Sequence, residues 1–302
     1  MALTLAAIRN HVLAMIDRDD SDTSSKVTDY INITGRDIWK AHPWNERQRE
    51  ASVITLDDYS TGTVTVTKAS ATVTGSGTTF PATIVNGRTK FSLGFGQPAY
   101  LIATRDSATQ LTLSDAYCEA TQSGATYVVY TDLYEVDSAC DTILDVALAY
   151  GTDGGPLSFA LERRMDELAF QPGSGGRPVA WCMKGPNSST GVKRIRLWPA
   201  PDDTYRLRYR YMTDYTDMSA DGDVCVVPES RRDLLICGTL RWAYRLSGDY
   251  QKAMAEEQKF AAMLRTHWER ERVVESQGSR LRPFDSGLLD IRGWDINTIG
   301  NS

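Results

Sequence analysis

The most regular hydrophobic pattern in the chain is an alternation of apolar and polar residues that begins near residue 61. Residues 62–67 read Gly-Thr-Val-Thr-Val-Thr, and residues 72–80 read Thr-Val-Thr-Gly-Ser-Gly-Thr-Thr-Phe. Val and Thr at a period of two residues are typical of half-buried β-strands. Further short strands are expected at residues 99–103, 110–113 and 126–130, after turns such as Gln122-Ser123-Gly124. Evenly spaced short strands predict an antiparallel barrel or sandwich module, assigned to residues 51–132.

A helical period replaces this alternation at the N-terminal end. Apolar residues recur at helical spacing within residues 4–17, where Thr4 is the expected N-cap: Leu5, Ile8, Val12 and Ile16. A second helix is predicted to end before Pro43, because the residue before a proline avoids the helical conformation. Two helices this close in sequence are expected to form an antiparallel hairpin within residues 1–50.

More helices are predicted in residues 133–276. Apolar spacing indicates helices at residues 136–150 and 157–170. Pro228 suits the first turn of a third helix, which ends at Ser247-Gly248-Asp249. Asp249 is then the expected cap of a last helix, over residues 250–274, and small residues are available where this last pair packs: Cys237, Gly238, Ala253 and Ala261. We therefore expect an α+β protein in which both chain ends form a small helical bundle and the β-module is inserted between them.

Residues 192–212 predict a β-hairpin with one apolar and one basic face. Tyrosines and a leucine alternate with arginines on the second strand, and the basic face carries Arg194, Arg196, Arg206, Arg208 and Arg210. Like charges opposite one another destabilise a sheet. Three interpretations stay open: a solvated face with charges paired to local aspartates, a contact with an acidic surface on a neighbouring subunit or the tail, and a contact with the DNA backbone.

The last segment, residues 277–302, loses the helical period but stays rich in large apolar side chains. These are Leu281, Phe284, Leu288, Leu289, Ile291, Trp294 and Ile296. Disordered tails are usually poor in such residues. We therefore expect an extended C-terminal arm that docks onto a partner, and the alternative is a strand packed on its own chain.

Several of these features together resemble the head-to-tail adaptors of tailed bacteriophages, also called tail tubular or head-completion proteins. The strand at residues 62–67 and the sequence Val-Thr-Gly-Ser-Gly-Thr-Thr-Phe after it resemble a β-module common in phage neck and tail proteins. Residues 195–205, Ile-Arg-Leu-Trp-Pro-Ala-Pro-Asp-Asp-Thr-Tyr, resemble the strand, Pro-x-Pro, Tyr, strand hairpin of these adaptors. Val227-Pro228-Glu229, which leads into a helix, a Gly-Asp break and a second helix, is similar to their C-terminal part.

The composition fits a folded structural protein. Charged residues make up 24% of the chain and apolar residues 41%, and the net charge is −6. A general grip on nucleic-acid phosphates needs clustered Lys and Arg, whereas an acidic wall is compatible with DNA sliding past it. The five scattered cysteines are expected to be reduced core residues, as in a protein assembled in the host cytoplasm, and not a disulfide frame or zinc site. No apolar run approaches the length of a membrane span, and no signal-peptide core is recognised, so a soluble protein is expected.

No catalytic, cofactor or metal site is predicted. His11, His42 and His267 have no Cys or Asp at nucleophile–base spacing, and Gly75-Ser76-Gly77-Thr78-Thr79 lacks the lysine of a phosphate-binding loop. Glu162 and Asp166 lie four residues apart among arginines, which is typical of a solvated helix face.

The resemblance implies a non-enzymatic virion protein of the neck. In that interpretation, copies of the chain form a ring, commonly of twelve, that binds the portal protein on one side and the tail tube or nozzle on the other. The ring surrounds passing DNA without sequence-specific contacts, and the C-terminal arm binds the portal. The alternatives are a tail-fibre or receptor-binding protein, which is expected to be a β-rich trimer, and a peptidoglycan-degrading enzyme.

Overall fold

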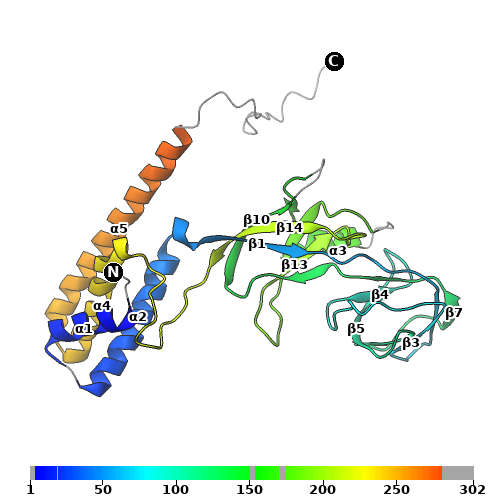
Figure 1. Ribbon diagram of the computed structural model, residues 1–302, viewed down its shortest axis with the longest axis horizontal. Helices are drawn as coiled ribbons and strands as arrows, with labels where there is room; N and C mark the ends of the chain where they lie inside the picture. Colours follow the sequence, from blue (N-terminus) through cyan, green and yellow to red (C-terminus); the bar gives the residue numbers. More distant parts are fainter. Residues whose placement is uncertain (1–3, 19, 150–153, 170–174, 281–302) are drawn as a thin grey trace, which may run out of the picture. The chain divides into compact units, whose positions relative to one another are not determined.

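The computed structural model describes residues 4–18, 20–149, 154–169 and 175–280 (Figure 1). Within these residues it contains five α-helices and fourteen β-strands, so the predicted α+β class is confirmed. The chain divides into two compact units. One comprises the chain up to Trp44 and from Tyr215 onward, and the other runs from Asn45 to Asp214. The predicted C-terminal arm lies outside the described residues from Leu281 on.

The first unit is helical and contains both chain ends. Its helices are α1 (Leu5–Ile16), α2 (Ser21–Ala41), α4 (Arg232–Ser247) and α5 (Tyr250–Arg280), with the short 3-10 helix η2 (Glu229–Arg231) before α4. Thr4 caps α1 as predicted, because its Oγ1 accepts a hydrogen bond from the Ala7 N–H at 3.3 Å. Asp249 likewise caps α5, accepting from the Lys252 N–H at 3.3 Å. Helix α5 continues to Arg280, so the expectation that residues 277–280 belong to an extended arm is wrong.

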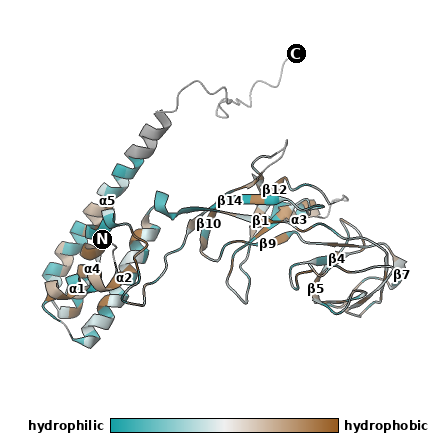
Figure 2. Cartoon of the chain, in the orientation of Figure 1, coloured by the Kyte–Doolittle hydropathy of each residue, from teal (hydrophilic) through white to brown (hydrophobic). Residues whose placement is uncertain are grey.

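The four helices share one apolar core. Its fully buried members include Leu5, Ile8, Val12, Val27, Ile31, Ile38, Leu234 and Leu235. Gly238 allows the close approach of the helices, because an added Cβ would lie 2.5 Å from the Thr34 Cγ2 and 2.7 Å from the Phe260 ring. Ala253 is also buried, but Ala261 is exposed and takes no part in this packing. Figure 2 shows apolar segments on α1 and α4, whereas polar residues predominate along the later turns of α5.

The second unit contains the predicted β-module as a curled half-barrel. Its strands are β2 (Thr63–Val66), β3 (Thr72–Ser76), β4 (Lys90–Ser92), β5 (Ala99–Arg105), β6 (Gln110–Leu113), β7 (Gln122–Ala125) and β8 (Val128–Tyr130). The strand order β7-β2-β3-β6-β5-β4-β8 places β7 and β8 at opposite edges of one sheet. These two strands are nevertheless separated in sequence by Thr126 and Tyr127, so the sheet has to curl to bring its edges together. The turn expected at Gln122-Ser123-Gly124 is strand β7, and β4 was not predicted.

A two-sheet sandwich makes up the rest of this unit. One sheet has the order β1 (Gln48–Ile54), β14 (Arg206–Thr213), β10 (Cys140–Leu148). The other has the order β11 (Ser158–Phe159), β12 (Ala180–Lys184), β13 (Arg194–Trp198), β9 (Leu133–Glu135). The short 3-10 helix η1 (Asn45–Arg47) precedes β1. Side chains from both sheets form one core that includes Ile143, Trp181, Ile195, Leu207 and Tyr209. Helix α3 (Glu162–Ala169) packs on the β12–β13 side through Met165.

The helix predicted at residues 136–150 is wrong, because this segment forms strand β10. The pairing of β10 with β14 shifts register between Ile143 and Asp145, which marks a β-bulge. The extra residue leaves the two inward-facing side chains, Ile143 and Val146, three positions apart. That spacing imitates a helical period. The helix predicted at residues 157–170 is shorter than expected, since α3 begins at Glu162 after strand β11.

The hairpin predicted for residues 192–212 does not form. Strand β13 pairs with β12 and β9, whereas β14 pairs with β1 and β10. The two strands therefore belong to different sheets and turn their apolar faces toward the common core. This arrangement avoids the line of opposed arginines that a hairpin would create.

Candidate partner-binding surface

Strand β14 presents three arginines on the outer face of the sandwich. Leu207, Tyr209 and Tyr211 point inward and are at most 5% exposed. Arg206, Arg208 and Arg210 alternate with them and are exposed. Because side chains alternate between the two faces of a strand, the buried tyrosines fix the direction of the arginines. We call the outer side of the sheet β1-β14-β10, with these three residues at its centre, the arginine face.

Acidic neighbours pair with the arginine face at one end. Arg210 lies opposite Glu50 of β1 and Asp145 of β10 in the register of the sheet. Its Nε donates to the two Asp145 carboxylate oxygens at 2.9 and 3.1 Å. This hydrogen bond lowers the pKa of Asp145 below its ordinary value. Arg208 reaches Glu50, with its Nε 3.6 Å from Oε1.

The other end of the arginine face is basic and apolar. Arg206 makes no ion pair with any residue in the described part of the chain. It lies opposite Ile54, whose side chain is 60% exposed. The face thus changes along β14 from paired charges at Arg210 to a free guanidinium beside an exposed apolar side chain at Arg206.

The two arginines of β13 lie in a different environment. Arg196 is only 12% exposed, and its guanidinium contacts two carboxylates: Nε is 2.9 Å from Asp132 and Nη1 is 2.5 Å from Asp166. Asp132 also binds Lys90 of the half-barrel at 2.7 Å. Arg194 donates to the backbone carbonyls of Gly185 and Pro186. The structure therefore separates the five predicted arginines into three on the exposed face of β14 and two on β13 that are less exposed.

Asp132 is a residue whose importance the sequence analysis missed. It is 4% exposed and binds Lys90 of β4 and Arg196 of β13. Arg196 in turn binds Asp166 of α3, so the cluster connects three elements. A second ion pair, Arg88 with Glu135 at 3.7 Å, connects the half-barrel to β9. These charges attach the half-barrel to the sandwich, whereas the apolar cores of the two remain separate.

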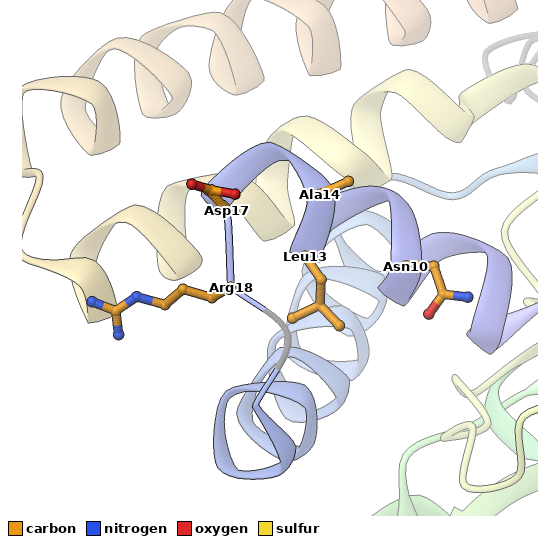
Figure 3. A pocket seen from close by; sticks show the side chains of 5 residues that line it. All are labelled: Asn10, Leu13, Ala14, Asp17 and Arg18. Carbon is orange, nitrogen blue, oxygen red and sulfur yellow. The ribbon is translucent and has the colours of Figure 1, made fainter.

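One hollow in the described part of the chain lies on the helical unit. The hollow beside α1 is lined by Asn10, Leu13, Ala14, Asp17 and Arg18 and has a volume of about 380 Å³. Figure 3 shows that Asn10 and Leu13 point to one side of the helix and that the charged ends of Asp17 and Arg18 point elsewhere, so no polar groups converge. No group of three His, Cys, Asp or Glu side chains in the described ranges is placed to hold a metal ion.

His42 and most of the cysteines lie in packed surroundings. His42 stacks on Trp268, with ring centroids 4.4 Å apart, and burial lowers its pKa. Four of the five free cysteines are buried as expected, but Cys118 is exposed, so its assignment to the core is wrong. None of the helices within the described ranges is long and apolar enough to cross a membrane.

The family described as SU10 adaptor protein matches residues 103–283, which is more than half of the chain. The chain belongs to the SU10 adaptor protein family. No curated protein matches the sequence.

The family match includes most of the residues that form the candidate surface. It begins in β5 of the half-barrel and contains β14, β10, β13 and α4. The N-terminal helices and β1 lie before it. SU10 adaptors are structural proteins of phage particles and are not an enzyme family, so this chain is a phage structural adaptor and a virion component. An adaptor of this kind associates with other phage head or tail proteins.

Proposed function

We propose that this adaptor forms a ring, of twelve copies, that connects the portal of the capsid to the tail. The observation that carries the proposal is the arginine face. Arg206 and Arg208 lie on the outer face of the three-stranded sheet, and the fold does not use Arg206 for any ion pair among the described residues. Exposed guanidinium groups on a rigid sheet can form bidentate pairs with carboxylates of a neighbouring protein.

In this proposal the arginine face of one copy contacts an acidic surface of the next copy or of the tail tube or nozzle. The gradient along the face gives the contact a direction. Arg210 is occupied by Asp145 in the same chain, whereas the Arg206 end offers an unpaired charge beside the exposed Ile54. The partner accordingly docks at the Arg206 end.

The same ring lines the DNA passage. A net charge of −6 gives the chain no general attraction for phosphates, so DNA passes without sequence-specific contacts. In this proposal residues 281–302, which lie outside the described residues, engage the portal through Leu281, Phe284, Leu288, Leu289, Ile291, Trp294 and Ile296. Fully extended at about 3.3 Å per residue, this segment could span roughly 70 Å. That reach is enough to leave its own subunit.

Imaging of the purified protein mixed with its portal by electron microscopy tests the ring. The expected result is a closed ring of twelve adaptors on the portal. A complex with three copies per particle would instead identify a fibre-like assembly and overturn the proposal.

Matched arginine variants test the arginine face. Arg206→Ser with Arg208→Ser should leave the fold intact and weaken ring formation, most strongly at low salt, because exposed charge pairs are screened by ions. Arg163→Ser with Arg164→Ser on α3 removes the same number of exposed arginines elsewhere and is the control. Equal assembly of both double variants at all salt concentrations would exclude a binding role for the face.

Truncation after Arg280 tests the arm. The shortened chain should remain folded, because the helical core is formed by residues before that point. It should no longer join the portal. If it binds the portal as well as the full chain does, the arm has a different function.

A further inference from the structure

Strand β1 lies at the edge of its sheet, and its hydrogen-bonding edge away from β14 pairs with no strand in the described part of the protein. It pairs with β14 over all seven of its residues, without a register shift. The Thr55 N–H donates to the Tyr205 carbonyl at 2.9 Å, which identifies Thr55 as a residue whose backbone faces β14. In an antiparallel pair this orientation alternates along the strand. The N–H and C=O groups of Glu50, Ser52 and Ile54 therefore point away from the sheet, and no hydrogen bond to them is found among the described residues.

This edge lacks most of the features that prevent strand addition. Edge strands are usually short or interrupted by proline, a bulge or charged residues. The sequence of β1 is Gln-Arg-Glu-Ala-Ser-Val-Ile, so its charges end at Glu50 and no proline or bulge interrupts it. Ile54 at the far end is 60% exposed.

The core of the sandwich is also open beside β1. Leu207 and Tyr209 of the neighbouring strand are at most 3% exposed, but Ala51 and Val53 of β1 are only partly buried although they pack against the same core. A further strand beside β1 would cover them. Its inward-facing positions would have to be apolar to extend this core.

We propose that β1 accepts an extended segment of another structural protein of the phage particle, which adds to the sheet as a fourth strand. The segment has apolar residues at every second position, against Ala51 and Val53, and a basic residue opposite Glu50. Backbone hydrogen bonds supply most of the affinity and the alternating side chains supply specificity.

A second copy of the chain is a poorer occupant. Antiparallel pairing of β1 with itself about Ala51 would place Glu50 opposite Ser52 and Gln48 opposite Ile54. Pairing about Ser52 would place Glu50 opposite Ile54, and pairing about Glu50 would place two glutamates opposite each other, so each register leaves a mismatch of charge or hydrophobicity. The other described edge strands are shorter or partly covered. Strands β7 and β9 have four and three residues, and the last three residues of β10, Val146 to Leu148, pair with residues 155–157.

Hydrogen exchange measured by mass spectrometry on residues 48–54 tests the proposal, with free protein compared to assembled particles. The amides of Glu50, Ser52 and Ile54 should exchange at least about tenfold more slowly in particles, since each gains a hydrogen bond. The amides of Arg49, Ala51 and Val53 bond to β14 in both states and serve as the internal reference. Equal exchange of the outward amides in both samples would overturn strand addition. Slow exchange in concentrated purified protein alone would identify a second copy as the occupant and overturn the choice of partner.

A proline variant supplies an independent test. Ser52→Pro removes only an outward-facing N–H, and proline is tolerated at such edge positions. The variant should fold, as judged by its circular dichroism and melting temperature, but should enter particles about tenfold less efficiently than Ser52→Ala, which keeps the N–H. Equal incorporation of a folded Ser52→Pro and Ser52→Ala would contradict the proposal. If Ser52→Pro does not fold, the exchange measurement on the unaltered protein decides.

Discussion

The β13 and β14 strands carry arginines in the same alternating pattern, yet the arginines have opposite surroundings. Arg196 of β13 is 12% exposed between two carboxylates, whereas the Arg208 and Arg210 side chains of β14 are 53% and 57% exposed. Both strands bury their apolar face in the same core. The difference arises from the other face, which is covered by α3 and the half-barrel on β13 and by no described element on β14.

This comparison separates two uses of the same residue. The Arg196 guanidinium holds parts of its own chain together, so its removal should affect folding. The β14 arginines add little to folding, and their removal should affect association. Stability measurements distinguish the two cases without any knowledge of the partner.

The largest expected effect is that of Arg196→Ser. The substitution leaves the buried Asp132 with one cation fewer and removes the partner of Asp166, and breaking a buried pair from one side costs about 3–5 kcal/mol. Arg208→Ser is the matched control and should cost less than about 1 kcal/mol, because its partner Glu50 is itself half exposed. Urea unfolding measures both. Similar losses of unfolding free energy for the two variants would contradict the difference in burial between Arg196 and Arg208.

The second prediction compares two aspartates, each of which binds arginine. Asp132→Asn removes a 4% exposed carboxylate that binds both Lys90 and Arg196, so we expect a loss of about 1–3 kcal/mol. Asp145→Asn removes the carboxylate that pairs with Arg210. Asp145 is more exposed than Asp132, so this substitution should cost less than about 1 kcal/mol. Because Asp132 connects the half-barrel to the sandwich, unfolding should also be followed separately in each of the two parts. A larger loss for Asp145→Asn than for Asp132→Asn would reverse the comparison.

The sequence predicts the faces of these strands but not their neighbours. Alternation along residues 205–211 correctly assigns Leu207 and Tyr209 to the core and Arg208 to solvent. A hairpin and a two-sheet sandwich bury the same face of each strand, so the period of two residues does not distinguish them. The cross-strand charges do favour the observed pairing, since Arg210 lies between Glu50 and Asp145.

Local features are predicted best. The Thr4 and Asp249 caps depend on backbone groups three residues away, and both were assigned correctly. The Asp132 cluster depends on Lys90 and Arg196, which lie 42 and 64 residues away in sequence, so no local pattern indicates it. The bulge in β10 shows the opposite failure, in which an irregular strand reproduces a helical spacing.

The smallest expected effect is the pH dependence of the Asp145–Arg210 pair. The pKa of Asp145 is lowered below the ordinary aspartate value of 3.8, chiefly by its hydrogen bond with Arg210. A carboxyl whose pKa is lower in the folded than in the unfolded state stabilises the fold above its unfolded pKa, and this contribution is lost as pH falls through the folded pKa.

A double-mutant cycle with Asp145→Asn and Arg210→Ser should therefore give a coupling free energy of about 0.2–1 kcal/mol at pH 7. The coupling should be unchanged down to about pH 5 and should disappear below the lowered pKa, where Asp145 is protonated and Arg210 keeps its charge. Added salt should reduce it at pH 7, because the pair is exposed. A coupling that persists after Asp145 is protonated would mean that the two side chains interact through packing. Arg210 would then contribute to folding as Arg196 does, contrary to the comparison of the two strands.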